Sequence, residues 1–217
     1  MNGQIVPIVV RSFLVSGSAA LLAGAIAVPL AVFLLLHDFR GKKTLVVISH
    51  SLLSIPAVFI GLCCYLLFAR SSPMGPLRLL YTPYAMILAQ ALLAAPISLT
   101  LVYSGLQPVV KPLRDTLLTL GAGRPQMILT LLFEGRRQVL TAMIMAFSRV
   151  IGETGMTMMV GGNIKGATRV MTTTIALETM KGNFELAIAL GAILLAVAVL
   201  LNVILHSLVR GRHALTL

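Results

Sequence analysis

The sequence predicts an all-α integral membrane protein with five transmembrane helices and a cytoplasmic helix-turn-helix loop. Of its 217 residues, 58% are hydrophobic and only 11% are charged, and the mean hydropathy is +1.00. Soluble domains carry about 25% charged residues. The apolar residues also gather in five long segments, which we treat as parts of one transmembrane domain, 1–217, because no internal repeat or low-complexity tract divides the chain.

Each apolar segment is long enough for the roughly 20 helical residues that a bilayer crossing requires. The predicted spans are 13–36, 45–68, 84–104, 139–160 and 186–209. The first is too long for the apolar core of a signal peptide, so we expect a retained span. Kinks are expected at the prolines inside the spans, since neighbouring helices can satisfy the freed carbonyl groups; these prolines are Pro29, Pro56 and Pro96.

The orientation follows from the Lys and Arg residues outside the spans. One set of connections holds ten: Arg40, Lys42, Lys43, Lys111, Arg114, Arg124, Arg136, Arg137, Arg210 and Arg212. The opposite set holds six: Arg11, Arg70, Arg78, Lys165, Arg169 and Lys181. The richer side is expected to be cytoplasmic. The sequence therefore predicts a multi-pass protein of the cell (inner or plasma) membrane with its N-terminus outside, its C-terminus inside and loop 105–138 in the cytoplasm.

That loop contains the signals of two short helices. Pro112 suits a first helical position, and Asp115 would lie in the first turn, where the helix dipole favours an anion. Leucines recur on one face at three- and four-residue spacing, at Leu113, Leu117 and Leu120. Gly121 can end this helix and Pro125 can begin another. We therefore expect a short helix, a glycine turn and a second helix that leads into the fourth span.

Three interpretations of this loop are open from the residues alone. It can be an amphipathic hairpin on the inner membrane surface, or a docking element for a groove on a cytoplasmic partner. A DNA-binding helix-turn-helix also uses a glycine turn, but attachment to a span at both ends disfavours it. The net charge of +11 is largely a topology signal, so we expect no nucleic-acid partner.

The loop resembles the signature of ABC-importer permeases. That signature has an acidic residue, two small residues, a glycine six positions after the acid, and an Ile-x-Leu-Pro-like end. The matching residues here are Asp115, Thr116, Leu117, Gly121 and the run Leu131-Leu132-Phe133-Glu134. Asp stands in place of Glu, Thr116 and Leu117 replace the small pair, and Glu134 occupies the usual proline position.

Two further segments resemble oxyanion-importer permeases, so that the resemblance covers residues 10–210. In 50–99 the matching points are Pro56, Gly61, Gly75-Pro76-Leu77, Thr82-Pro83, Gln90 and Pro96; in 149–178 they are Arg149, Gly152-Glu153, Gly155, Gly161-Gly162-Asn163 and Thr172–Thr174. Within the family the chain is most similar to tungstate-uptake permeases of the TupB type, with molybdate and sulfate permeases next.

The resemblance implies the MetI/ModB-like permease fold and a homodimeric pore for a tetrahedral oxyanion. Tungstate is the expected substrate, and molybdate or a sulfate- or phosphate-type anion is the alternative. It also implies two cytoplasmic ABC ATPase subunits, an extracytoplasmic oxyanion-binding protein and a bilayer of lipid as partners. The residues that match the ATPase-coupling helix of the family are Leu113, Arg114, Asp115, Thr116, Leu117 and Gly121.

Arg149 and Glu153 are unusual because each charge at a helix centre costs roughly 2.5–3.5 kcal/mol on insertion scales. Their i, i+4 spacing predicts that they share a helix face and pair. The pair is either a structural ion pair or part of the translocation pathway, and intramembrane ionisable residues are by default functional hypotheses. Gly152 and Gly155 flank the pair, where small residues allow close helix approach.

No catalytic, metal or cofactor site is expected. The stretch "RGKKT" at 40–44 lacks the first glycine of a Walker A motif, so ATP hydrolysis is expected in a separate subunit. The four histidines have no metal-ligand spacing, and the adjacent Cys63 and Cys64 form neither a disulfide framework nor a metal set. A self-powered anion channel or secondary carrier stays open as an alternative of a different class. The outer segment 163–185 is expected to be a re-entrant lip, a dock for the binding protein, or a plain surface loop.

Overall fold

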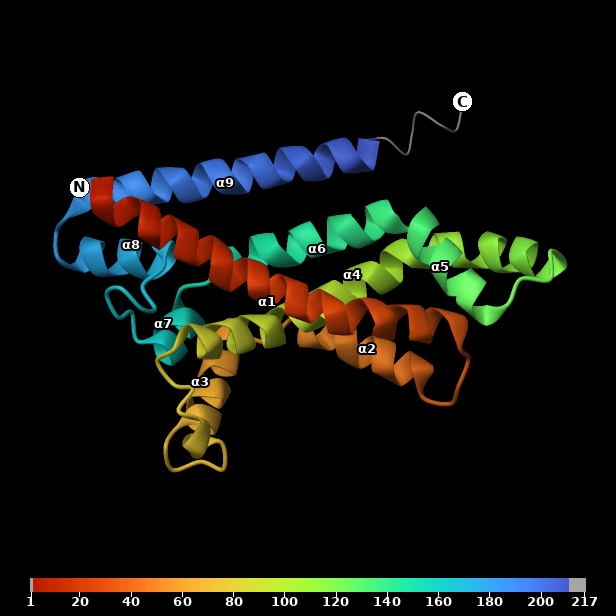
Figure 1. The fold of residues 1–217 in the computed structure, drawn as a ribbon, viewed down its shortest axis with the longest axis horizontal. Helices are drawn as coiled ribbons and strands as arrows, with labels where there is room; N and C mark the ends of the chain where they lie inside the picture. Colours follow the sequence, from red (N-terminus) through yellow and green to blue (C-terminus); the bar gives the residue numbers. More distant parts are fainter. Residues whose placement is uncertain (1, 211–217) are drawn as a thin grey trace.

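The computed structural model describes residues 2–210, and within that range the chain is helical without a β-strand. The helices form an elongated bundle, in which α1 begins at the end where α8 lies and α9 runs back towards the end where α5 lies (Figure 1). The elements are α1 (Asn2–Leu36), α2 (Lys42–Leu52), α3 (Ala57–Phe68), the 3-10 helix η1 (Gly75–Leu77), α4 (Pro83–Thr119), α5 (Arg124–Glu134), α6 (Arg136–Ile151), α7 (Gly155–Gly161), α8 (Met171–Met180) and α9 (Phe184–Arg210).

Within the described chain, three helices are long and apolar enough to cross a bilayer on their own. They are Ile5–Leu36 of α1, Pro83–Thr119 of α4 and Phe184–Ser207 of α9. The first and third predicted spans, 13–36 and 84–104, fall inside the first two. The fifth, 186–209, lies within α9 and ends two residues after Ser207, so the prediction of long apolar helices at all three places is confirmed. Pro29 and Pro96 lie inside α1 and α4 without ending either helix.

The second and fourth spans differ from the single helices expected over 45–68 and 139–160. Helices α2 and α3 meet at 98°, and α6 and α7 meet at 69°. At the first break Pro56 is extended, with φ −61° and ψ 127°, because proline has no backbone N–H to donate and disfavours helical geometry in the residue before it. If each bent pair is one span, the described chain has up to five.

Helix α1 packs along α4 and α6 through a row of alanines. Ala19, Ala23, Ala27 and Ala31 recur every fourth residue and are each at most 2% exposed. Residues four apart lie on one face of a helix, and small side chains let two helix backbones approach closely. The stripe therefore fixes α1 against the centre of the bundle.

The short helix α7 lies in close contact with α3 and α4. A Cβ added at Gly61 of α3 would lie 2.8 Å from the Cα of Met156, and one added at Gly161 of α7 would lie 2.8 Å from the sulfur of Met86 in α4. These distances are shorter than any relaxed contact between carbon and its neighbours. Glycine at position 61 is thus a condition for the approach of α3 to the α7 backbone, whereas a side chain at position 161 would require the Met86 side chain to move.

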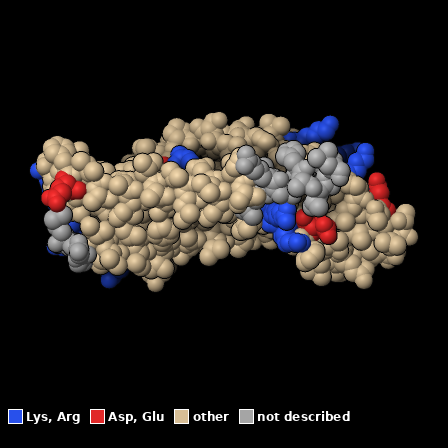
Figure 2. All heavy atoms as spheres, turned by 90° about the horizontal axis from the view of Figure 1, so that it is seen from above, with Lys and Arg blue, Asp and Glu red and all other residues tan. Residues whose placement is uncertain are grey.

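Helix α9 packs against α6 and α8 but leaves most of its apolar surface open. The side chains with 54 to 69% exposure are Phe184, Ile188, Leu195, Val199, Leu200 and Val203. Figure 2 shows one long face of the molecule on which Lys, Arg, Asp and Glu gather towards the two ends, with almost entirely uncharged surface between them. Such a band is the surface that a bilayer requires.

The beginning of loop 105–138 differs from the expectation. Pro112 does not start a helix, and Asp115 does not lie in a first turn, because α4 continues from Pro83 to Thr119 with Pro108 and Pro112 inside it. These prolines are four residues apart, so their missing N–H groups lie on one helix face and the opposite face keeps its hydrogen bonds. Leu113 also packs against the buried cluster that joins α1, α4 and α6. The glycine turn and the start of α5, with Pro125 in its first turn, are as predicted.

Candidate functional site

The break between α6 and α7 places a backbone carbonyl inside the bundle without a helical partner. The carbonyl oxygen of Glu153 accepts hydrogen bonds from the hydroxyls of Thr157 (2.7 Å) and Thr172 (3.0 Å). Both threonines are buried. Non-helical backbone at membrane depth is tolerated when protein groups satisfy it, so these hydroxyls make the break a stable feature that joins α6, α7 and α8.

The Glu153 side chain lies next to the guanidinium of Arg149, as their spacing predicted. Arg149 Nη1 donates to Glu153 Oε2 over 2.9 Å. The pair is nevertheless not on one helix, because α6 ends at Ile151 and Glu153 lies in the break. The Arg149 side chain is 48% exposed and that of Glu153 is 12% exposed. One partner is therefore anchored in the protein and the other reaches the open surface of the subunit.

This arrangement can act on an anion or on a facing subunit. A guanidinium presents several N–H donors, and the bond to Glu153 uses one of them. The remaining donors face the exposed side, where they can bind an oxyanion or a carbonyl group. The two threonine hydroxyls fix the backbone of Glu153, and its carboxylate is in turn bonded to Arg149.

The two glycines predicted beside the pair have different surroundings. An added Cβ at Gly155 would lie 3.0 Å from Val58 Cγ2 of α3, so this glycine sits at a helix contact. At Gly152 an added Cβ would meet none of the described atoms within 4 Å. Close packing therefore explains Gly155 and not Gly152.

The predicted coupling residues lie in a separate part of the molecule. We name the end of α4, the glycine turn and α5 (residues 111–134) the hairpin. It lies at the end of the bundle where α5 is drawn, away from α7 and α8 (Figure 1). Arg114, Asp115 and Thr116 are exposed there, whereas Leu113 and Leu117 are half-buried. The polar side of this segment thus faces outward and its leucines face the bundle.

Gly121 has a defined structural role in the hairpin. Its φ is +72°, and two hydrogen bonds close the end of α4: Gly121 N–H to the Leu118 carbonyl (3.1 Å) and Ala122 N–H to the Leu117 carbonyl (2.9 Å). This pair of bonds is the Schellman motif, which favours glycine because other residues are strained at positive φ. The predicted glycine turn is therefore confirmed in its geometry.

Several anchoring residues were missed by sequence reasoning. The hydroxyl of Ser12 in α1 accepts from Met171 N–H at the start of α8 (2.8 Å). The guanidinium of Arg11 donates to the carbonyls of Arg169 (3.1 Å) and Gly166 (2.7 Å). Both contacts join segments more than 150 residues apart, so no local pattern reveals them. They tie segment 163–171 to α1, and with α8 this makes the outer segment an ordered structure and not a plain loop.

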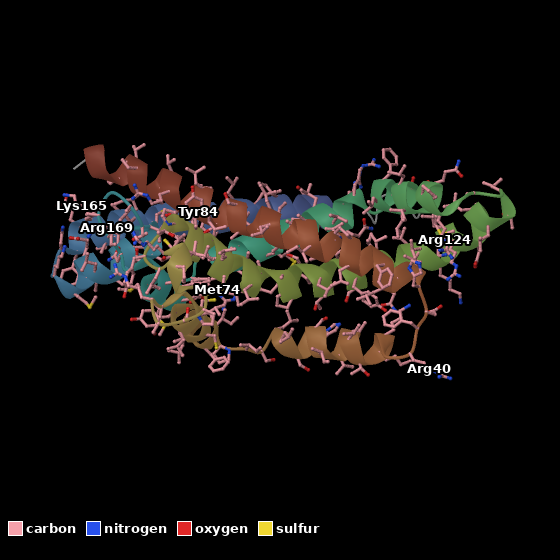
Figure 3. The ribbon with its side chains drawn as sticks, turned by 60° about the horizontal axis from the view of Figure 1, so that its bottom comes forward. Arg40, Met74, Tyr84, Arg124, Lys165 and Arg169 are labelled. Atoms are coloured by element: carbon pink, nitrogen blue, oxygen red, sulfur yellow. The ribbon has the colours of Figure 1, made fainter. Side chains whose placement is uncertain are left out.

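Four basic residues, two from each predicted set, illustrate how the sets are separated in the molecule. Figure 3 shows Arg40 and Arg124 at one end and Lys165 and Arg169 at the other. Among the described residues, no group of three or more His, Cys, Asp or Glu side chains could hold a metal ion.

Comparison with known proteins decides between the functional classes left open above. Over 205 residues the chain is 40% identical to the tungstate uptake system permease protein TupB of Peptoclostridium acidaminophilum, covering 94% of this chain and 90% of that protein. The chain belongs to the permease subunits of anion ABC transporters. The permease is also 37% identical to a probable anion ABC transporter permease protein of Haloferax volcanii, over 91% of this chain and 88% of that protein.

A third relative is the tungstate uptake system permease protein TupB of Campylobacter jejuni, 36% identical over 80% of the permease and 72% of that protein. No family model matches the chain. Permease subunits of ABC systems are not the catalytic subunits, and ATP is hydrolysed in a separate subunit. The chain is therefore a multi-pass, non-enzymatic membrane component of an anion transport system, as its sequence predicted.

Proposed function

We propose that this permease forms the membrane pathway of a tungstate importer. The observation that carries the proposal is the 40% identity, over nearly the full length of both chains, to a permease of a tungstate uptake system. Molybdate and a sulfate- or phosphate-type anion are the alternative substrates, because these dianions share tetrahedral geometry with tungstate. An extracytoplasmic binding protein delivers the anion, and two ABC ATPase subunits on the cytoplasmic side drive its release.

In this proposal the subunit crosses the membrane five times, with the N-terminus outside and the C-terminus and hairpin in the cytoplasm. Broken pairs α2–α3 and α6–α7 each count as one crossing. The subunit functions as a homodimer, as the resemblance of its sequence to importer permeases implies. The ten basic residues of the hairpin side, against six on the other, support this orientation.

The hairpin is the element that receives the motion of the ATPase. Asp115 and Thr116 present polar groups to the partner, with the exposed Arg114 beside them, and Leu113 connects the segment to the core, with Leu117 half-buried one turn further on. Because α4 is unbroken from the hairpin to Pro83, displacement at the hairpin passes along one helix into the membrane.

Arg149 and Glu153 form part of the gate along the dimer axis. The exposed half of Arg149 faces the second subunit, and its bond to Glu153 exchanges for a contact with that subunit or with the passing anion. Gly155 keeps α7 close to α3 at this point. An intramembrane ion pair beside a break in the helix is the arrangement expected where backbone and charge line a polar path.

The test is transport by the reconstituted system. The chain, its copurifying ATPase and its binding protein are placed in vesicles, and uptake of tungstate, molybdate and sulfate is measured with and without ATP. We expect ATP-dependent uptake of tungstate that needs the binding protein. Uptake without ATP or ATPase would overturn the importer in favour of a self-powered carrier, and preference for molybdate or sulfate would overturn the substrate alone.

A further inference from the structure

A cavity at the hairpin end of the molecule is separate from the Arg149–Glu153 pair. It has a volume of about 200 Å³ and lies between the end of α1 and the hairpin. A single water needs only ~10–15 Å³ by this measure. The cavity is therefore large enough for a phosphate-sized group together with water.

Two arginines from different helices line this cavity. Arg114 comes from α4 and Arg124 from the start of α5, and His37 lies at the end of α1. Figure 3 shows Arg124 at the same end of the molecule as Arg40, where α1 ends. The Nδ1–H of His37 donates to the Phe33 carbonyl (3.2 Å), and its ring stacks on Phe33. The imidazole is thus held in place at the cavity wall.

The positive charge of the cavity is not neutralised by a nearby acid. Among the side chains that the structure describes, neither Arg114 nor Arg124 forms an ion pair. The Asp38 carboxylate, close to the end of α1, is held by the Lys42 ammonium at 2.8 Å. Lys42, and to a smaller extent Arg114, lowers the pKa of Asp38. Asp38 therefore stays ionised but is occupied by lysine, which leaves the arginines to a ligand.

The rest of the cavity wall is apolar, and the cavity lies at the end of the apolar band of the molecule. Leu118, Met127 and Ile128 line the cavity beside Leu36, the last residue of the first long apolar helix. The cavity thus lies where α1 leaves the apolar band. Guanidinium groups bind phosphate-type oxyanions through paired N–H donors, and basic pockets at this depth are suited to anionic lipid headgroups.

We propose that this cavity is a binding site for a phosphate-type oxyanion, which clamps the hairpin to the end of α1. The same chemistry has two sources, the phosphate of an anionic lipid or a free oxyanion in the cytoplasm. Arg114 and Arg124 hold the charge, and the apolar wall receives the first carbons of a lipid chain when the source is a lipid. Occupation joins α1, α4 and α5 at the point where we place ATPase coupling, so it regulates coupling without lying on the transport path.

The experiment measures binding to the full chain purified in detergent, with whatever subunits stay bound. One series titrates short-chain phosphatidic acid against phosphatidylcholine of equal chain length; a second titrates sodium phosphate and sodium tungstate without lipid. Binding is read from native mass spectrometry and from the shift in thermal unfolding. The variant is Arg124→Gln, and the matched control is Arg40→Gln, an arginine at the same end that does not line the cavity.

We expect binding of the phosphatidic acid or of the free anions, weakened about tenfold or more in Arg124→Gln and unchanged in Arg40→Gln, because one charge-assisted hydrogen-bonding group is lost. Phosphatidic acid alone assigns the lipid source, and phosphate or tungstate alone assigns the free anion. Equal binding by both variants, or no anion binding at all, would overturn the proposal. Should Arg124→Gln not assemble, Arg124→Lys keeps the charge but loses the paired donors, and the same loss of affinity is expected.

Neither outcome depends on transport. A chain that imports no tungstate can still bind an anion here, and a working importer can lack the site. The failure of this inference is thus distinguishable from the failure of the proposed function.

Discussion

The ion pair between Arg149 and Glu153 supports a prediction that separates a structural role from a role in transport. The change is Arg149→Gln, then Glu153→Gln, then both together. Breaking a buried ion pair by removing one partner costs about 3–5 kcal/mol, whereas exposed pairs contribute about 0–1 kcal/mol. Arg149 is 48% exposed and Glu153 12% exposed over a 2.9 Å contact, so we expect about 1–3 kcal/mol for either single change.

Stability is measured by denaturant unfolding of the purified complex, and function by ATP-driven uptake into vesicles. The double variant should recover most of the stability, since it leaves no unpaired charge. If the pair belongs to the pathway, transport stays low in the double variant although the protein is stable. Normal transport by the double variant, or by Arg149→Gln alone, would refute the pathway role.

Three further changes test other parts of the molecule. Gly61→Ala should destabilise the protein by about 1–3 kcal/mol in denaturant unfolding, because its Cβ would lie 2.8 Å from the backbone of α7. The control is Gly17→Ala, whose Cβ would meet no described atom within 4 Å; it should be neutral or stabilising in the same assay. Gly121→Ala should cost about 1–2 kcal/mol at φ +72° and reduce ATP-driven uptake, whereas Gly123→Ala, at φ −74°, should not. The Glu178 pKa is lowered by hydrogen bonds from Lys181 and Asn183, so its stabilisation of the α8–α9 turn is present above about pH 4.5, the unfolded value, and is lost as the pH falls through the folded pKa. The hydrogen-exchange protection factors of this turn should fall over that range, and the fall should be absent in Glu178→Gln.

Long apolar runs predicted the spans well because the length of a crossing helix is set by the bilayer and read from local composition. The breaks were harder to predict. A proline inside a span predicts some kink, but the 98° turn after α2 also depends on the close fit of α3 on α7 at Gly61. That contact joins residues about 95 positions apart, beyond any local pattern.

Two errors have the same physical origin. Proline at a first helical position and proline inside a helix look identical locally, so Pro112 was assigned as a helix start; packing of Leu113 against the core favours continuation. The i, i+4 spacing correctly brought Arg149 to Glu153. It did not predict that Glu153 lies outside the helix. One of the hydrogen bonds that stabilise the break comes from Thr172, 19 residues further along the chain, and local spacing does not reveal it.

The continuity of α4 has a mechanical consequence. Its 37 residues measure about 55 Å at ~1.5 Å per residue, against a hydrocarbon layer about 30 Å thick. A tilt of about 10° around its middle moves each end by roughly 5 Å, by the geometry of such a rod. The two neighbouring crossings are each broken, at α2–α3 and α6–α7, so α4 is the element that joins the hairpin to the far side of the layer as one helix.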